Sequence, residues 1–317
     1  MPGSFLKVNY SIRPAKSVER KMLSEAFRLL SRFESLNSYQ YVGMGSPYFT
    51  DFSLFHKSLG IRHMTSMEAM KEHRDRIEFN KPFRCIDLVF EPSTEALPNL
   101  EWDRKTILWL DYDYEDGLRM ECLTDISTFC AAARSGSVLV VTVDARPSKN
   151  PETRLSELIG KLGVKVPEET RDKDLDELWG TARVYREIIN NEIDKARSER
   201  NGALLPKEQL QYKQLFNFHY SDSSKSRMLT VGGILYEEGD ADLMKACDFG
   251  SLPFIKDGPE AYTIEVPILT LREVRHLDKQ LPSPQGEGLS GFTIDPEELR
   301  RYSEIYRYYP SYVEAEF

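Results

Sequence analysis

The chain has 317 residues, of which 40% are hydrophobic and 29% are charged, a composition typical of a globular protein with one large domain or two smaller ones. Its net charge of −9 argues against non-specific binding of nucleic acid by the whole surface, although a local basic patch is not excluded. No apolar run approaches the roughly 18 residues that span a bilayer, and residues 1–7 lack the apolar core of a secretory signal. We therefore expect a cytoplasmic protein with no membrane segment.

The cysteines offer no sign of a structural metal site. Cys85, Cys122, Cys130 and Cys247 include no Cys-x-x-Cys pair and no Cys/His cluster with the spacing of zinc ligands. We expect thiols that pack as small apolar groups.

The first predicted element is a helix that begins after Ser17, its expected N-cap. Apolar residues recur at helical spacing from Met22 to Phe33, which predicts a helix that packs one face against a sheet. The turn before it, Arg13-Pro14-Ala15-Lys16, carries two cations. We expect a solvated turn, and the alternative is a turn that reaches over a ligand site.

From Ser38 to Asp144, short apolar stretches alternate with helical patterns. This alternation predicts an α/β fold with a Rossmann-like, mostly parallel sheet and helices on both of its faces. The expected strands are Tyr39–Val42, His63–Glu68, Cys85–Phe90, Ile107–Leu110 and Ser137–Val143, and the expected helices between them are Pro47–Leu59, Met70–Phe79 and Leu118–Ala133.

Residues 148–227 are rich in charge and helical in pattern, with the best helices at Trp179–Ile193 and Pro206–Phe218 and no convincing strand. We expect a helical insertion that acts as a lid or as a substrate platform. Met228–Tyr236 and Tyr262–Leu271 predict two more strands, antiparallel neighbours at the sheet edge, with Pro267 inside the second. The sheet would then have seven strands, and the cofactor-binding core would comprise residues 1–147 and 228–290.

Residues 291–317 predict a C-terminal helix and an aromatic tail. Asp295 and Pro296 are typical of an N-cap residue and the first helical position. The aromatic side chains of this segment include Tyr302, Tyr306, Tyr309, Tyr312 and Phe317. We expect the tail to dock on its own domain, and the alternative is binding to a protein partner. The sequence also leaves a homo-oligomer open.

The segment Tyr41-Val42-Gly43-Met44-Gly45-Ser46 reads as a strand that runs into a Gly-x-Gly turn. Glycine lets backbone N–H groups approach a ligand, and the helix N-terminus behind the turn favours negative charge. Glu68 follows at the end of the second strand, where a ribose-binding acid is expected. The third glycine of the dinucleotide fingerprint is missing, so the turn by itself predicts only a nucleoside-like ligand.

Polar residues follow each of the five parallel strands. Ser93 comes after the third strand, Asp111 and Asp113 after the fourth, and Asp144 after the fifth. Because ligands of open α/β sheets bind outside the C-terminal ends of the strands, we expect these residues to gather around one site. Each residue also has a simpler interpretation, as a helix cap, a turn residue or a solvated acid.

Three residues are candidates for catalysis. Asp111 and Asp113 could serve as a general base or a substrate-amine anchor. Together with Asp144 they could also bind a metal, but these ligands are few for magnesium, and we expect no metal. His219, at the exit of the insertion, could overhang the site as a base, and the alternative is an ordinary packed histidine.

These motifs together resemble the class I S-adenosylmethionine-dependent methyltransferases. More narrowly, the segments 41–46, Phe79-Asn80-Lys81-Pro82-Phe83 and Trp109-Leu110-Asp111-Tyr112-Asp113 resemble bacterial proteins labelled putative O-methyltransferases. The resemblance spans residues 10–147 and returns after Met228.

The resemblance implies a role for each matching position. The turn formed by Gly43, Met44, Gly45 and Ser46 would contact the methionine part of S-adenosylmethionine, and Glu68 would bind both ribose hydroxyls. Ser93 would contact the adenine edge, and Asp111 would bind the amino group of the cofactor or the substrate. The Asp-Pro-Pro-Tyr and Pro-Cys motifs of DNA methyltransferases do not follow strand four, so methylation of DNA bases loses support.

Methyl transfer requires little beyond in-line alignment of the acceptor with the sulfonium, sometimes with a base. The sequence therefore predicts a methyltransferase with an O- or N-directed acceptor that it does not identify. A second hypothesis is a degenerate cofactor-binding subunit that acts as a sensor or scaffold in a complex. A third is a nicotinamide-dependent dehydrogenase, which the missing glycine and the acidic end of strand four disfavour.

Overall fold

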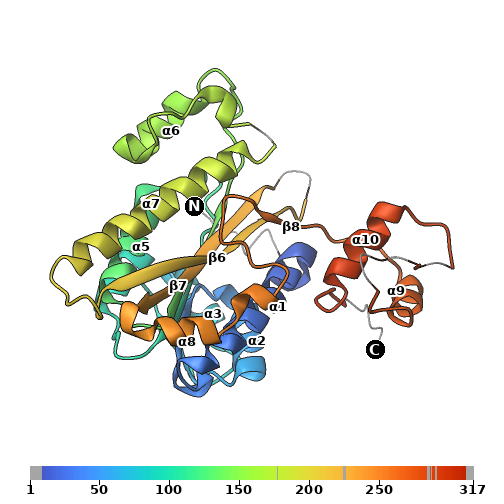
Figure 1. Cartoon of the computed structure of the whole chain (residues 1–317), viewed down its shortest axis with the longest axis horizontal. Helices are drawn as coiled ribbons and strands as arrows, with labels where there is room; N and C mark the ends of the chain where they lie inside the picture. The colour runs from blue at the N-terminus through green and yellow to red at the C-terminus, as the bar shows by residue number, and fades with distance from the viewer. Residues whose placement is uncertain are drawn as a thin grey trace.

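The structure is a computed structural model that describes residues 9–176, 178–223, 226–283, 286, 288–289 and 291–311 (Figure 1). The N-terminal segment that we expected to lack a signal, and the tail residues Tyr312 and Phe317, lie outside the described residues. None of the described helices is both long enough and apolar enough to cross a bilayer.

One sheet runs through the described part of the chain and contains eight strands, one more than expected, in the order β3-β2-β1-β4-β5-β7-β6-β8. Its first five strands pair in parallel, as predicted. The strands are β1 (Gln40–Gly43), β2 (His63–Met67), β3 (Ile86–Val89), β4 (Thr106–Asp111), β5 (Ser137–Asp144), β6 (Leu210–Tyr220), β7 (Met228–Glu237) and β8 (Tyr262–Ile264). The predicted α/β fold with a mostly parallel sheet is confirmed.

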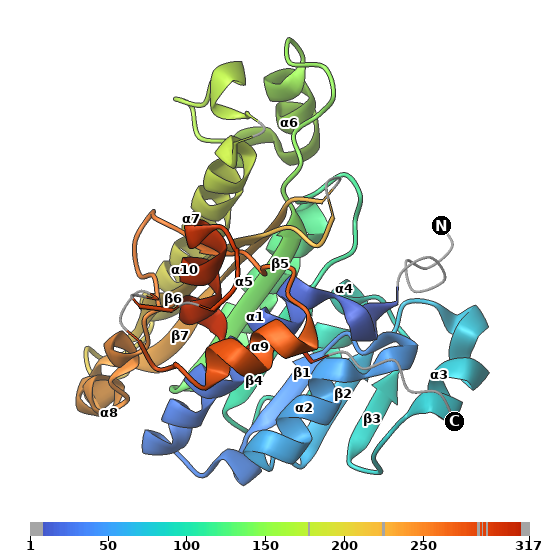
Figure 2. The ribbon, with the colours of Figure 1, turned by 90° about the vertical axis from the view of Figure 1, so that its right-hand side faces the viewer.

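Helices cover both faces of this sheet (Figures 1 and 2). They are α1 (Pro14–Leu29), α2 (Thr50–Leu59), α3 (Arg74–Asn80), α4 (Ser93–Ala96), α5 (Met120–Ala132), α6 (Arg154–Leu162), α7 (Gly180–Asn201), α8 (Ala241–Ala246), α9 (Leu271–Asp278) and α10 (Pro296–Ile305). Successive strand residues point to opposite faces, so Ile107 packs in the cluster with α1 and α2 while Leu108 packs in the cluster with α5 and α7. This alternation explains why the strands are apolar throughout.

The prediction of a helix over Pro206–Phe218 was wrong, because β6 occupies Leu210–Tyr220 and pairs antiparallel with β7. A bulge between Gln214 and Phe216 places Leu215 and Phe216 in the same core cluster. The two-residue alternation that identifies a strand is therefore interrupted at its centre. As a result, the segment 148–227 is not wholly helical, since its last part belongs to the sheet.

The predicted pairing of the last two strands was also wrong. Strand β7 is antiparallel but lies between β5 and β6, and the short edge strand β8 pairs in parallel with β6. Pro267 lies beyond the end of β8, where it blocks no ladder hydrogen bond. The antiparallel strand that the resemblance implied is present, but it lies inside the sheet.

The helical part of the insertion projects from the body of the molecule. Helix α7 packs along α5 through Ile188, Ile189 and Ile193, and α6 lies beyond the C-terminal end of β5 (Figure 2). A role of this segment as lid or platform remains a prediction.

The described part of the aromatic tail docks on its own chain. Ile305 and Tyr308 are buried in the same core cluster as α1, and Lys21 of α1 donates to the carbonyls of Tyr308 and Tyr309 at 3.0 Å. Asp295 caps α10 by accepting from the Glu297 amide at 2.8 Å, as predicted.

Candidate functional site

The C-terminal ends of β1 to β4 surround a cavity, with Arg20 of α1 on its wall. Most of the predicted site residues line this cavity, namely Met44, Gly45, Ser46, Glu68, Ser93, Asp111 and Asp113. Gly43, Asp144 and His219 are not among its lining residues. The strand-end argument therefore brought together residues that lie up to 69 positions apart, from Met44 to Asp113.

Gly43 and Gly45 of the turn each lack room for a side chain, but for different structural reasons. A Cβ on Gly43 would lie 2.6 Å from the Tyr41 hydroxyl, so this glycine makes room for a buried ring rather than for the cavity. A Cβ on Gly45 would lie 2.7 Å from Ser66 Oγ and 2.6 Å from the Phe49 ring. The next residue, Ser46, has a φ of 49°, a left-handed conformation that is uncommon outside glycine. The turn is thus a tightly packed segment whose backbone faces the cavity at Gly45 and Ser46.

Glu68 is a buried carboxyl at the end of β2. Ser66 Oγ donates to its Oε1 at 2.7 Å and accepts from the Gly45 amide at 2.9 Å, which links the acid to the turn. Burial raises the pKa of Glu68 to about 7, although hydrogen bonds from Ser66 and from the backbone amides of Ser46 and Gly45 oppose this rise. A ligand that donates hydrogen bonds to Glu68 would favour its ionised form.

Ser93 lines the cavity, but its hydroxyl is already engaged. It donates to Asp125 Oδ2 of α5 at 2.5 Å, and the Tyr112 hydroxyl donates to the same oxygen at 2.6 Å. Burial raises the pKa of Asp125, while these two hydrogen bonds act in the opposite direction. Asp125 therefore holds both Ser93 and Tyr112 in place. The Tyr112 ring also stacks on the Tyr114 ring, with centroids 5.5 Å apart.

Asp111 and Asp113 do not form an isolated carboxylate pair. Asp111 Oδ1 lies 2.8 Å from the ammonium of Lys16, whereas Asp113 is exposed on the cavity wall. The expectation that the segment 13–16 is a solvated turn was wrong. Helix α1 starts at Pro14 rather than after Ser17, and the Lys16 side chain is 0% exposed.

Two charged residues of helices α1 and α2 that line the cavity were missed at the sequence level. Arg20 and Asp51 both line the cavity, and the Tyr41 hydroxyl donates a short hydrogen bond to Asp51. Burial raises the pKa of Asp51, and the charge of Arg20 counteracts it. The available signal was the spacing of Arg13, Lys16 and Arg20 at three and four residues, which places three cations on one face of a helix.

His219 and Asp144 lie outside this cavity. His219 is a buried residue of β6 that stacks on Trp179 with centroids 4.5 Å apart. Burial, together with the nearby charge of Arg183, lowers its pKa to about 4. Asp144 accepts from Arg146 Nε at 2.7 Å. Across the described residues, no three His, Cys, Asp or Glu side chains gather as metal ligands.

The charge of the cavity favours a cation. Among the described residues, its lining carries five acids and one basic side chain, that of Arg20; the acids are Asp51, Glu68, Glu91, Asp111 and Asp113. Not all five act as free negative charges, because Asp111 is paired with Lys16 and burial raises the pKa of Asp51 and of Glu68. Walls of low dielectric strengthen such a field, so a positively charged ligand gains more here than in bulk water. The arrangement suits a nucleoside that bears a positive group beside the fourth strand.

The loop that follows β4 also contributes to a second cavity. The first cavity includes Tyr114, and the second is lined by Glu115 and Asp116 together with residues of the helical insertion. Thr181 of α7 lines it, and the Thr181 hydroxyl is buried without a hydrogen-bond partner among the described residues. An unpartnered buried hydroxyl is costly, so a ligand group could satisfy it.

The sequence matches the model of a family described as "Putative O-methyltransferase" over residues 8–317. No curated protein matches it.

Solved structures with low similarity include the N-methyltransferase NodS from Bradyrhizobium japonicum WM9, with 12% identity, a TM-score of 0.38, and coverage of 69% of this chain and 97% of NodS. Trm1 from Pyrococcus horikoshii, solved with S-adenosyl-L-methionine, has 10% identity and a TM-score of 0.44, with 71% and 57% coverage. The plantazolicin methyltransferase BamL, solved with S-adenosylhomocysteine, has 10% identity and a TM-score of 0.44, with 70% and 86% coverage. All three TM-scores lie below 0.5, so no residue roles are transferred from these structures.

The raised pKa of Glu68 predicts a pH dependence of stability in the ligand-free protein. Between pH 4.5 and about 7 the folded chain retains a proton on Glu68 that the unfolded chain has released. The contribution of Glu68 to the free energy of unfolding is therefore full below pH 4.5 and is lost as the pH rises through about 7. Urea unfolding across this range should show a weaker decline for Glu68→Gln than for the wild type. Glu95→Gln, which changes an exposed acid outside the cavity, should follow the wild type. Equal profiles for the wild type and Glu68→Gln would contradict the assignment.

Proposed function

We propose that this chain, which belongs to the family of putative O-methyltransferases, is an S-adenosylmethionine-dependent methyltransferase whose strand-end cavity binds the cofactor through Glu68, Asp111 and Arg20. The observation that carries the proposal is the convergence of these three side chains with the Gly45 backbone on one cavity. Each of them matches a different chemical group of the cofactor.

Glu68 is proposed to bind the ribose. Two neighbouring hydroxyls can donate to the two oxygens of one carboxylate, and such hydrogen bonds are stronger when the carboxylate is ionised. In the ligand-free chain the Ser66 hydroxyl donates to Oε1 of Glu68, so the ribose hydroxyls would add further donors to the same carboxylate. The ribose would thus supply the donors that stabilise the charged form of a buried acid.

The methionine end of the cofactor is proposed to lie between α1 and β4. Asp111 would accept hydrogen bonds from the α-amino group through Oδ2, since Oδ1 is bonded to Lys16. Arg20 would bind the carboxylate, for which a guanidinium is well suited. The remaining acids favour the sulfonium cation, and the neutral thioether product loses that attraction, which would help its release.

Adenine is proposed to occupy the part of the cavity beside Pro92 and Ser93, between Met70 and Tyr112. The Ser93 hydroxyl is directed to Asp125. We therefore assign the adenine contact to the Ser93 backbone rather than to its side chain.

The protein's part in catalysis is proposed to be alignment, with Asp113 as the candidate base. Asp111 is paired with Lys16, whereas Asp113 is exposed at the cavity wall, where a proton could reach solvent. His219 is not proposed as the base, because it stacks on Trp179 away from this cavity.

The acceptor is proposed to bind in the second cavity, with the helical insertion as its platform. This cavity adjoins the cofactor cavity through the loop from Tyr114 to Asp116 and is otherwise lined by α6, α7 and the segment after β5. Its mixture of charged and apolar walls suits a small polar acceptor with a hydroxyl or amino nucleophile. A cytoplasmic location completes the proposal.

The scaffold hypothesis is weaker than it was at the sequence level. The aromatic tail and the large insertion motivated it, and Tyr302, Ile305 and Tyr308 of the described part of the tail are buried against their own chain. No described feature of the cavity favours it over catalysis.

Calorimetry with S-adenosylhomocysteine tests the cofactor assignment. The wild type should bind, and Glu68→Ala should bind about tenfold or more weakly because a charged hydrogen-bond acceptor is lost. Glu95→Ala, which changes an exposed acid outside the cavity, should bind as the wild type does. Absence of binding by the wild type, with no difference for Glu68→Ala, would contradict the proposal, and binding of NAD in its place would favour a dehydrogenase.

The second cavity yields a test at Thr181. Thr181→Val should stabilise the free protein by about 1 kcal/mol, because it removes a buried hydroxyl without a partner. Thr142→Val is the matched control, since this buried hydroxyl bonds Trp109 Nε1 at 3.0 Å and its loss should destabilise. Thermal unfolding measures both, and once an acceptor is identified by mass-spectrometric screening, Thr181→Val should raise its KM. Destabilisation by both variants would show that Thr181 is an ordinary structural residue.

A further inference from the structure

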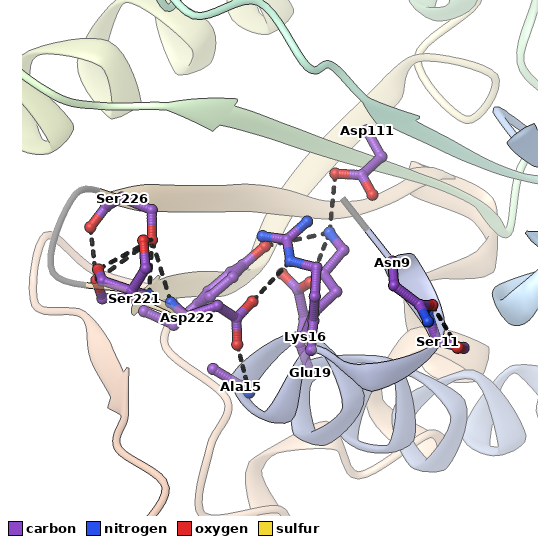
Figure 3. Close-up of polar contacts among 12 residues, drawn as sticks. Asn9, Ser11, Ala15, Lys16, Glu19, Asp111, Ser221, Asp222 and Ser226 are labelled. Carbon is purple, nitrogen blue, oxygen red and sulfur yellow. Dashed lines mark hydrogen bonds and ion pairs between the residues drawn. The ribbon is translucent and has the colours of Figure 1, made fainter. Parts of the chain in front are cut away.

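Lys16 is a fully buried cation that joins helix α1 to the end of strand β4. Its ammonium lies 2.8 Å from Asp111 Oδ1 and 2.8 Å from Glu19 Oε2, and it bonds the Tyr220 hydroxyl at 3.2 Å. The same nitrogen lies 4.3 Å from the centre of the Trp109 ring, a favourable cation–π distance. Figure 3 shows Lys16 between Glu19 and Asp111, with the second oxygen of Asp111 turned away from the ammonium.

A buried lysine is costly unless its charge is matched, and here two carboxylates match it. Glu19 is itself 0% exposed, whereas the side chain of Asp111 is 25% exposed and lines the cofactor cavity. Lys16 therefore connects a carboxylate that is shielded from solvent to one that lines the cavity. This asymmetry indicates that Asp111 is the functional end of the cluster.

A chain of buried hydrogen bonds fixes Glu19, at the other end of this cluster. Trp109 Nε1 donates to Thr142 at 3.0 Å, Thr142 and Thr230 share a hydrogen bond of 2.7 Å, and the Thr230 hydroxyl donates to Glu19. The indole that starts this chain is the one whose face Lys16 covers. The polar ring links α1 to β4, β5 and β7, so the position of the ammonium is determined by three strands.

The start of α1 is held by a separate contact. Asp222, in the loop between β6 and β7, accepts from the Ala15 amide at 2.7 Å and from Arg13 Nε at 2.9 Å (Figure 3). A carboxylate at a helix N-terminus satisfies an unpaired amide and interacts favourably with the helix dipole. This contact sets the register in which Lys16, one residue later, meets Asp111.

We propose that Lys16 is a positioning residue, which anchors Oδ1 of Asp111 so that Oδ2 is presented to the α-amino group of the cofactor. The inference rests on the proposed function, because it needs Asp111 to meet the amino-acid end of the ligand. Without the ammonium, Asp111 and Glu19 would be two like charges close together with no cation between them, and one of them would have to take up a proton or move away. Asp111 is the one free to move, since it is partly exposed.

Calorimetry with two ligands tests the proposal. S-adenosylhomocysteine carries the amino-acid end, whereas 5′-methylthioadenosine contains the same adenosine and sulfur without it. Lys16→Met should lower the affinity for S-adenosylhomocysteine about tenfold or more. The affinity for 5′-methylthioadenosine should stay within about threefold of that of the wild type. Lys21→Met removes a cation from the same helix that contacts only the tail carbonyls among its described hydrogen bonds, and it should leave both affinities unchanged.

A loss of affinity for S-adenosylhomocysteine but not for 5′-methylthioadenosine distinguishes a positioning role of Lys16 from a merely structural one. If Lys16→Met weakens both ligands alike, or neither, the inference is overturned while the proposed function stands. If the wild type binds neither ligand, the proposed function fails and the inference falls with it. Should Lys16→Met fail to fold, the double variant Lys16→Met/Glu19→Gln removes the uncompensated Glu19 charge, and it should show the same selective loss.

Discussion

The Lys16 ammonium ties the N-terminal helix to the end of the fourth strand, and this contact positions two parts of the wall of the proposed cofactor cavity. Asp111 forms part of one wall, and Arg20, one helical turn after Lys16, forms part of the other. A buried charge tolerates little displacement, because each partner that moves away leaves a desolvated ion. The cluster therefore fixes where a carboxylate and a guanidinium stand relative to each other, which is what recognition of an amino acid requires.

Electrostatics then determine the kind of ligand that suits the cavity. Five lining acids and one arginine favour a cationic ligand, and the buried Glu68 needs donors to be ionised. A sulfonium nucleoside with an amino-acid end satisfies each of these demands with a different group. The same field would separate cofactor from product, since methyl transfer converts the sulfonium to a neutral thioether.

Much of the fold could be predicted because the sequence patterns that define its strands are local. The five parallel strands are short apolar stretches, and the strand-end rule then identified Gly45, Glu68, Ser93, Asp111 and Asp113 as neighbours. Strand β6 was missed because its bulge interrupts the alternation around Leu215. Lys16 and Arg20 were missed because their burial depends on where α1 crosses the sheet, and Lys16 meets a partner 95 residues away. A predicted helix start after Ser17 also left Lys16 in a turn instead of on the helix face that it shares with Arg20.

A crystal structure of the protein with S-adenosylhomocysteine bound tests the account most directly. The account predicts that both ribose hydroxyls bond Glu68 and that the α-amino nitrogen bonds Asp111 Oδ2 while Lys16 stays on Oδ1. A ligand bound elsewhere, or an amino group that contacts no oxygen of Asp111, would contradict it.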